Sequence, residues 1–281
     1  MHLKVRPLSE SLGVELLDVD LHRDMTSRLA AVLTGLLYDH AVLCIRRQPL
    51  SPAELAHFGE HFGRPVHHNE ENLRLDGLPG VMSLSNADQR DDRQLNGGAH
   101  WHTDLIHSDD PASFTMLHAV AVPASGGGTM FSNQVAAFEA LPPERQALAE
   151  SITLIHCYEG RRDGSMPTFL HPLVRRHPAT GRKALFGAAD TGIGIVGMAP
   201  DQAEPLLEAF ALHATRPEFV YRHTYQPDDI VIWDNAQLLH CAERLRRATS
   251  SDTRRIMHRV SVRGWPARIP RTLGPHGVRR R

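Results

Sequence analysis

Apolar residues in the first third of the chain follow a strand period and then a helical one. The stretch GVELLDVDL (13–21) alternates like a strand, and MTSRLAAVLTGLLYDH (25–40) has apolar residues at helical spacing. AVLCIRR (41–47) is a short β-branched run that predicts a second strand. SPAELAHFGEHFG (51–63) predicts a helix with Pro52 in its first turn. These elements predict a mixed helix and strand region at the start of the chain.

From about residue 66 to residue 110 the hydrophobic pattern is lost. The segment is polar and rich in Asn, Asp, His and Gly. We expect a long irregular stretch here, and long loops in compact domains are usually functional or disordered.

The rest of the chain predicts many short strands. Six runs have this character: SFTMLHAVAV (113–122), GTMFSN (128–133), SITLIHCYE (151–159), DIVIWDN (229–235), QLLHCA (237–242) and RIMHRVSVRG (255–264). Helices are expected over 133–151 and 197–215. Because the strands do not alternate regularly with helices, the pattern favours a β-sandwich or barrel over a parallel sheet. Since no repeat or linker interrupts the chain, we expect one domain over residues 1–281.

Composition narrows the class of protein. The 281 residues are 41% hydrophobic and 22% charged, with a formal net charge of −1. This near-neutral balance gives no reason to expect nucleic acid or a membrane surface as a partner. The N-terminus lacks the apolar segment of a signal peptide, and three widely spaced cysteines do not suggest a disulfide framework. We therefore expect a cytoplasmic protein.

Histidine is abundant, with 19 residues, and His-x-acid occurs four times. The copies begin at His22, His68, His102 and His107. A histidine and a carboxylate two positions apart can hold one edge of a metal ion, but this many histidines also produces the pattern by chance. The copies at His22 and His107 lie in ordinary turn sequences, where a carboxylate more often caps backbone N–H groups.

The copy in AHWHTD differs because a third ligand is available. His102 and Asp104 can point to the same side of an extended segment. His240, on a short apolar run after a turn, is well placed to complete the set. Two imidazoles and one carboxylate on one face of an ion leave three positions open, as in non-haem iron(II) oxygenases.

Longer motifs carry a family resemblance. AHWHTD, SGGGTMFSN, IVIWDNAQLLHCA and RRIMHRVSVRG occur in the order, and at close to the spacing, of 2-oxoglutarate-dependent iron dioxygenases. The chain resembles the taurine dioxygenase and dichlorophenoxyacetate dioxygenase group in particular, from VRPL to VRG. The resemblance implies a mainly β fold with flanking helices around a double-stranded β-helix, or jelly-roll, core.

The resemblance also implies roles for single residues. His102, Asp104 and His240 would be iron(II) ligands. Thr129 and Arg255 would bind the cosubstrate 2-oxoglutarate, since a planar guanidinium holds a carboxylate with two parallel hydrogen bonds. The resemblance places two further residues, Arg259 and His68, near the substrate.

Several alternatives stay open. Arg254 competes with Arg255, although Arg255 shares a strand face with Arg259. A slip of one residue would put His67 in place of His68. Thr129 could be an ordinary strand residue. The glycine run before it lacks the Lys-Ser/Thr of a phosphate loop, so a tight turn explains it.

Trp233 and Phe131 could line a pocket or belong to the core, and Cys241 is expected to be buried on the strand face opposite His240. Gly98 stands where taurine-type enzymes have a substrate-binding asparagine, which leaves the substrate open.

The implied activity is oxidation, most simply hydroxylation, of a C–H bond in a small anionic substrate, with O₂ consumed and succinate and CO₂ released. Ether or C–S cleavage, desaturation and ring formation are alternative outcomes of the same site. A protein of another class, a jelly-roll that binds without turnover, would hold the same scaffold and could carry zinc. A homo-oligomer, either dimer or tetramer, is compatible with the resemblance.

Overall fold

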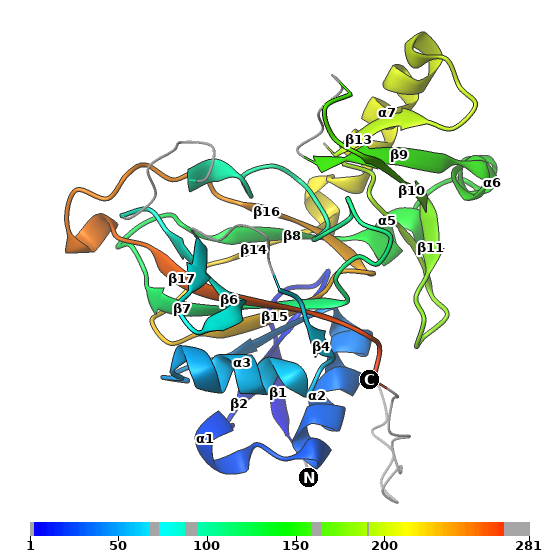
Figure 1. Ribbon diagram of the computed structural model, residues 1–281. Helices are drawn as coiled ribbons and strands as arrows, with labels where there is room; N and C mark the ends of the chain where they lie inside the picture. The colour runs from blue at the N-terminus through cyan, green and yellow to red at the C-terminus, as the bar shows by residue number, and fades with distance from the viewer. Residues whose placement is uncertain (1–2, 68–72, 88–94, 159–163, 190, 267–281) are drawn as a thin grey trace, which may run out of the picture.

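Two facing sheets form the centre of the protein (Figure 1). The computed structural model describes residues 3–67, 73–87, 95–158, 164–189 and 191–266. The large sheet has the order β1-β2-β3-β15-β7-β17-β6-β5, with β4 also paired to β17, and the small one has the order β14-β8-β16. Strands of the large sheet are β1 (Lys4–Pro7), β2 (Val14–Leu17), β3 (Val42–Ile45), β4 (Arg64–Pro65), β5 (Arg74–Leu75), β6 (Leu78–Ser85), β7 (Phe114–Ala121), β15 (Ile230–Asp234) and β17 (Ile256–Arg263). Strands of the small sheet are β8 (Thr129–Asn133), β14 (Val220–His223) and β16 (Leu238–Ala242).

Each face of the large sheet buries a different layer. Helices α2 (Ser27–His40) and α3 (Pro52–Glu60) cover one face, while the small sheet lies over the other (Figure 1). Strand β15 shows the alternation that produces this: Ile230 and Ile232 pack in the helix-side core, and Val231 and Trp233 pack in the core with residues of the small sheet.

A third group of elements extends from one end of the sheets (Figure 1). It contains the sheet β10-β9-β13 and the strand pair β11-β12. Its members are α5 (Gln134–Glu139), α6 (Pro143–Ser151), β9 (Thr153–Cys157), β10 (Thr168–Pro172), β11 (Val174–Arg176), β12 (Lys183–Leu185), β13 (Gly192–Ile195) and α7 (Pro200–Ala214). A one-turn helix, α1 (Leu21–Asp24), precedes α2. Across the described ranges, no helix combines the length and the apolar character that a membrane span needs.

Strand β17 positions the polar groups between the sheets. Met257 belongs to the core between the sheets, and Arg255 and Arg259 line a cavity there, whereas Val260 and Val262 pack toward the helices. The pairing of β17 with β7 shifts by one residue between Ile256 and Met257, but its register with β6 runs on unbroken. The extra residue therefore lies on β7, and the alternation of β17 is preserved.

The mainly β architecture with flanking helices is confirmed, but two expected elements are wrong. The segment expected to be irregular from residue 66 to residue 110 contains β6, which pairs with β17 over five residues. Pro79 and Gly80 hid this strand, because both residues are typical strand breakers. The helix expected over 133–151 is two helices, since Pro142 and Pro143 end one and begin the next.

Candidate active site

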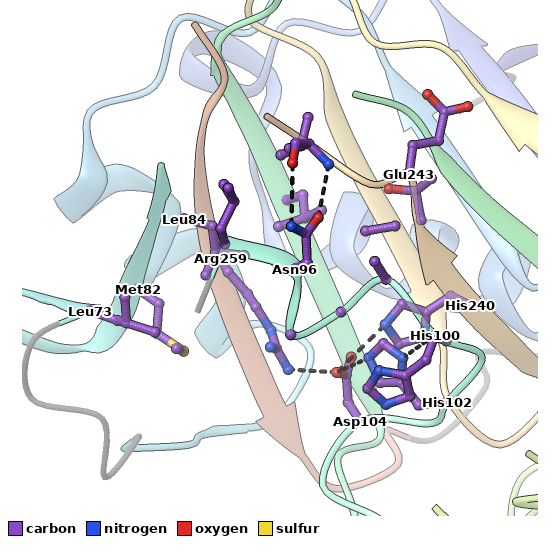
Figure 2. A pocket seen from close by; sticks show the side chains of 18 of the residues that line it. Leu73, Met82, Leu84, Asn96, His100, His102, Asp104, His240, Glu243 and Arg259 are labelled. Atoms are coloured by element: carbon purple, nitrogen blue, oxygen red, sulfur yellow. Dashed lines mark hydrogen bonds and ion pairs between the residues drawn. The ribbon is translucent and has the colours of Figure 1, made fainter. Parts of the chain in front are cut away.

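Three predicted metal ligands meet between the two sheets. His240 lies on β16, and His102 joins that strand through a single antiparallel bridge with two backbone hydrogen bonds. Asp104 follows in a turn, so the extended segment expected for this motif ends before the carboxylate. Its Oδ1 atom lies 3.8 Å from His102 Nε2 and 3.6 Å from His240 Nε2 (Figure 2). These side chains offer three ligand atoms within 4.8 Å of one another.

The two imidazoles are held in a form that can bind a metal. His102 Nδ1 donates to the carbonyl of His100 at 2.8 Å, so its Nε2 lone pair is left to face Asp104. Burial lowers the pKa of His102 well below its ordinary value, with His240 as a second cause. Burial also lowers the pKa of His240, to about 4. Both rings are therefore neutral at pH 7, as metal ligands must be.

Hydrogen bonds fix the carboxylate of Asp104. Thr115 donates its hydroxyl to Oδ2 at 2.7 Å, and the amide of Asn235 donates to that hydroxyl at 3.1 Å. Asn235 also accepts from the backbone N–H of Asp104 and from the indole of Trp233. Burial raises the pKa of Asp104, but Arg259, the two histidines and Thr115 together lower it below its ordinary value. Asp104 is therefore ionised and oriented.

Arg259 contacts this carboxylate directly. Its Nη2 donates to Asp104 Oδ1 at 2.6 Å, and Figure 2 shows the guanidinium reaching Asp104 from β17. Arg259 also lines a cavity of about 470 Å³. Apolar side chains form much of the cavity wall: Leu73, Met82, Leu84, Leu95, Leu105, Leu117 and Leu245.

The same cavity has a second buried arginine. Arg255 is 5% exposed, its Nε donates to the carbonyl of Gly127 at 2.8 Å, and burial lowers its pKa from the ordinary value. No carboxylate forms an ion pair with Arg255 within the described ranges. Thr129 lies nearby on β8, and its hydroxyl is 3.0 Å from that of Tyr225. A buried guanidinium remains charged and is costly without a partner, so this end of the cavity suits an anion.

Comparison with known proteins identifies the family. The family described as "Taurine catabolism dioxygenase TauD, TfdA family" matches residues 4–261. The chain belongs to the TauD/TfdA family. The predicted resemblance is confirmed, and members of this family are iron(II)- and 2-oxoglutarate-dependent dioxygenases.

Similar proteins cover nearly the whole chain. The alpha-ketoglutarate-dependent 2,4-dichlorophenoxyacetate dioxygenase of Cupriavidus pinatubonensis is 31% identical, over 90% of this chain and 99% of its own length. An alkylsulfatase of Acinetobacter baylyi is 28% identical over 99% of this chain and 88% of its own. A taurine dioxygenase structure from Burkholderia xenovorans has a TM-score of 0.81 and 31% identity, covering 93% of this chain and 89% of its own. The jelly-roll core is therefore confirmed.

In this TauD/TfdA chain, the structure shows which of the alternative candidate residues line the cavity. Arg254 is exposed and does not line the cavity, whereas Arg255 does. The prediction for His68 lies outside the described residues, and His67 is exposed and does not line the cavity. His107 lines the cavity and contacts Tyr158, and it is not one of the three clustered ligands.

The pocket and core alternatives are also separated. Trp233 lines the cavity, but Phe131 is a core residue outside its lining. Cys241 is buried, as expected.

Several contributing residues were not predicted. Thr115 and Tyr225 support Asp104 and Thr129, but their contacts come from other strands, and no local motif marks them. Asn96 lines the cavity two residues before Gly98, yet its amide is used in two hydrogen bonds with the backbone of Leu245 (Figure 2). Asn96 therefore does not take the place of the substrate-binding asparagine that taurine-type enzymes have at the position of Gly98.

A second possible metal-binding set lies elsewhere in the core. Cys44, His223 and Asp229 are buried and offer ligand atoms within 4.8 Å. Asp229 is already ion-paired with Arg46, and burial raises the pKa of the Cys44 thiol to about 12. None of the three lines the cavity. This set is best explained as a buried structural network.

Proposed function

We propose that this dioxygenase oxidises a C–H bond of a small anionic substrate, most simply by hydroxylation. Two guanidinium groups in the cavity of the candidate metal ligands support this most directly: Arg255, immediately before β17, and Arg259, on β17. Arg255 would bind one anion, the cosubstrate 2-oxoglutarate, and Arg259 the other, the substrate.

His102, Asp104 and His240 would hold the iron. Two neutral imidazoles and an ionised carboxylate match the ligands of a facial iron(II) site. Iron(II) bound there would supply the centre at which O₂ and 2-oxoglutarate react, with release of succinate and CO₂. The protein's contribution is to orient these ligands through His100, Thr115 and Asn235.

The cosubstrate would bind beside β8. The Arg255 guanidinium and the Thr129 hydroxyl both line the cavity and can hydrogen-bond a carboxylate. Burial raises the pKa of Tyr225 to about 12, so this phenol stays protonated and can donate to the Thr129 oxygen. Thr129 is then left to donate its own proton to the bound anion.

The substrate would place its acidic group at Arg259 and its body along the apolar wall. Relatives named for dichlorophenoxyacetate, sulfate ester and sulfonate substrates all act on anions, which supports this assignment. The apolar side chains exclude water from the reacting bond. Which bond lies nearest the metal would decide between hydroxylation, cleavage beside a heteroatom, desaturation and ring formation.

Succinate release tests the proposal. We expect the purified protein with iron(II), 2-oxoglutarate and O₂ to release succinate faster in the presence of one class of carboxylate, sulfonate or sulfate ester. Arg259→Gln should raise the KM for that anion more than it raises the KM for 2-oxoglutarate. Iron binding without anion-dependent succinate from any member of the panel would instead indicate a binding protein.

A further inference from the structure

We propose that Arg259 couples the binding of an anion in the cavity to the binding of the metal ion, through Asp104. This inference rests on the proposed function, because it takes His102, Asp104 and His240 as the metal site. It gives Arg259 a second role, as a positioning residue that makes metal affinity depend on the anion.

One oxygen atom is shared by the two sites. Asp104 Oδ1 is the carboxylate atom that faces both imidazole Nε2 atoms, and it also accepts the 2.6 Å hydrogen bond from Arg259 (Figure 2). The carboxylate cannot rotate to offer one oxygen to the metal and the other to Arg259 without losing a hydrogen bond, since Thr115 donates to Oδ2 at 2.7 Å. Asp104 is 3% exposed, so solvent screens little of the resulting interaction.

Arg259 has donors left over for a ligand. Its described ion pair is made by Nη2 with Asp104, and the side chain is 19% exposed, so the guanidinium presents further N–H groups to the cavity that it lines. Neighbouring strands place Met82 and Leu117 opposite it, so the guanidinium lies on an apolar surface. An anion in the cavity would therefore find a cation with unused N–H groups.

The charges then determine the direction of the coupling. A divalent cation bound by the histidines and the guanidinium of Arg259 would both interact with the negative charge of Asp104 Oδ1. Because the two positive charges repel each other, each weakens the binding of the other to this oxygen. An anion that pairs with Arg259 offsets this charge or draws it away from Oδ1. The anion thus strengthens metal binding, and by linkage the metal strengthens anion binding by the same factor.

Cobalt(II) titration of the full chain, without 2-oxoglutarate, tests the coupling. Metal-free protein is titrated calorimetrically in the presence and absence of butanesulfonate, which provides an anion but coordinates metals poorly. We expect butanesulfonate to tighten cobalt binding by roughly tenfold, within the usual range of coupling between sites. Arg259→Gln should bind cobalt more tightly than the wild type without sulfonate, and sulfonate should no longer change its affinity.

Matched variants separate the possible failures. Arg254→Gln removes an exposed arginine and should behave like the wild type, and Arg255→Gln should keep the sulfonate effect because its anion site is different. Arg259→Lys keeps the charge and should keep weak cobalt binding. The coupling is overturned if sulfonate leaves the wild-type affinity unchanged, or if Arg259→Gln does not tighten binding. Failure of His102→Ala to lose cobalt would instead overturn the metal site itself.

Discussion

At the scale of residues, two arginines in the cavity wall, one just before β17 and one on it, differ in what already binds them. Arg259 has an acidic partner in Asp104, whereas Arg255 is held by a backbone carbonyl and has no carboxylate partner in the described part of the chain. Arg254, beside it in sequence, is exposed. Burial therefore distinguishes Arg255 from Arg254, the two residues between which the sequence motif alone leaves the cosubstrate role open.

Replacing Arg255 should weaken cosubstrate binding. Hydrogen bonds to charged groups contribute about 1.5–3 kcal/mol, so Arg255→Gln is expected to raise the KM for 2-oxoglutarate by roughly tenfold or more. Steady-state succinate formation measures this. Arg254→Gln is the matched control, and equal effects of the two variants would remove the cosubstrate role from Arg255.

At the scale of elements, a tight glycine turn sets the start of β8. Gly126 and Gly127 have φ of +74° and +72°, which favours glycine. A Cβ on Gly128 would lie 2.5 Å from the carbonyl oxygen of His223 on the neighbouring strand. The glycines therefore allow the close approach of backbones that places Thr129 in the cavity.

Gly128→Ala should disturb this element. We expect a loss of about 1–3 kcal/mol of unfolding free energy from the forced backbone shift, together with a higher KM for 2-oxoglutarate. Thermal unfolding and kinetics measure the two effects. Gly98 lies in the cavity wall, and the Cβ of Gly98→Ala would meet its nearest atoms at 3.7 and 3.8 Å, so this change should have little effect. Equal destabilisation by both changes would argue against the proposed close approach.

The sequence predicts elements well where one period runs without breakers. Strands β7, β15 and β17 follow from short strand-like runs, and α2 follows from helical spacing. Strand β6 could not be predicted in this way, since Pro79 and Gly80 interrupt it and its pairing with β17 comes from the tertiary fold. Residues in long motifs could be placed from sequence, but Thr115 and Tyr225 act through contacts with distant strands.

At the scale of the whole molecule, buried neutral histidines connect the site to stability. Burial lowers the pKa of His156 to about 3 and that of His240 to about 4. A histidine in the unfolded chain titrates near 6.5, so the unfolded state takes up protons first as the pH falls.

We propose that this chain works as one domain, and its oligomeric state stays a prediction.

Acid should therefore destabilise the metal-free protein. The contribution of the buried neutral histidines to the free energy of unfolding is fully present above about pH 6.5 and is lost as the pH falls toward 4. The loss is up to about 2 kcal/mol per buried histidine between pH 6.5 and pH 5. Asp104 acts in the same direction, because a carboxyl with a lowered pKa also contributes stability that is lost in stronger acid. Urea unfolding at pH 7 and pH 5 measures the loss. His156→Gln should reduce it, with the exposed His57→Gln as control, and an unchanged difference would contradict the explanation.

We propose above all that His102, Asp104 and His240 hold the iron that binds 2-oxoglutarate. Anaerobic addition of iron(II) and 2-oxoglutarate should give a weak visible charge-transfer absorption band in the wild-type protein. The band should disappear in His102→Ala and Asp104→Ala and remain in His107→Ala. Loss of the band in His107→Ala, with the band retained in His102→Ala, would contradict the account.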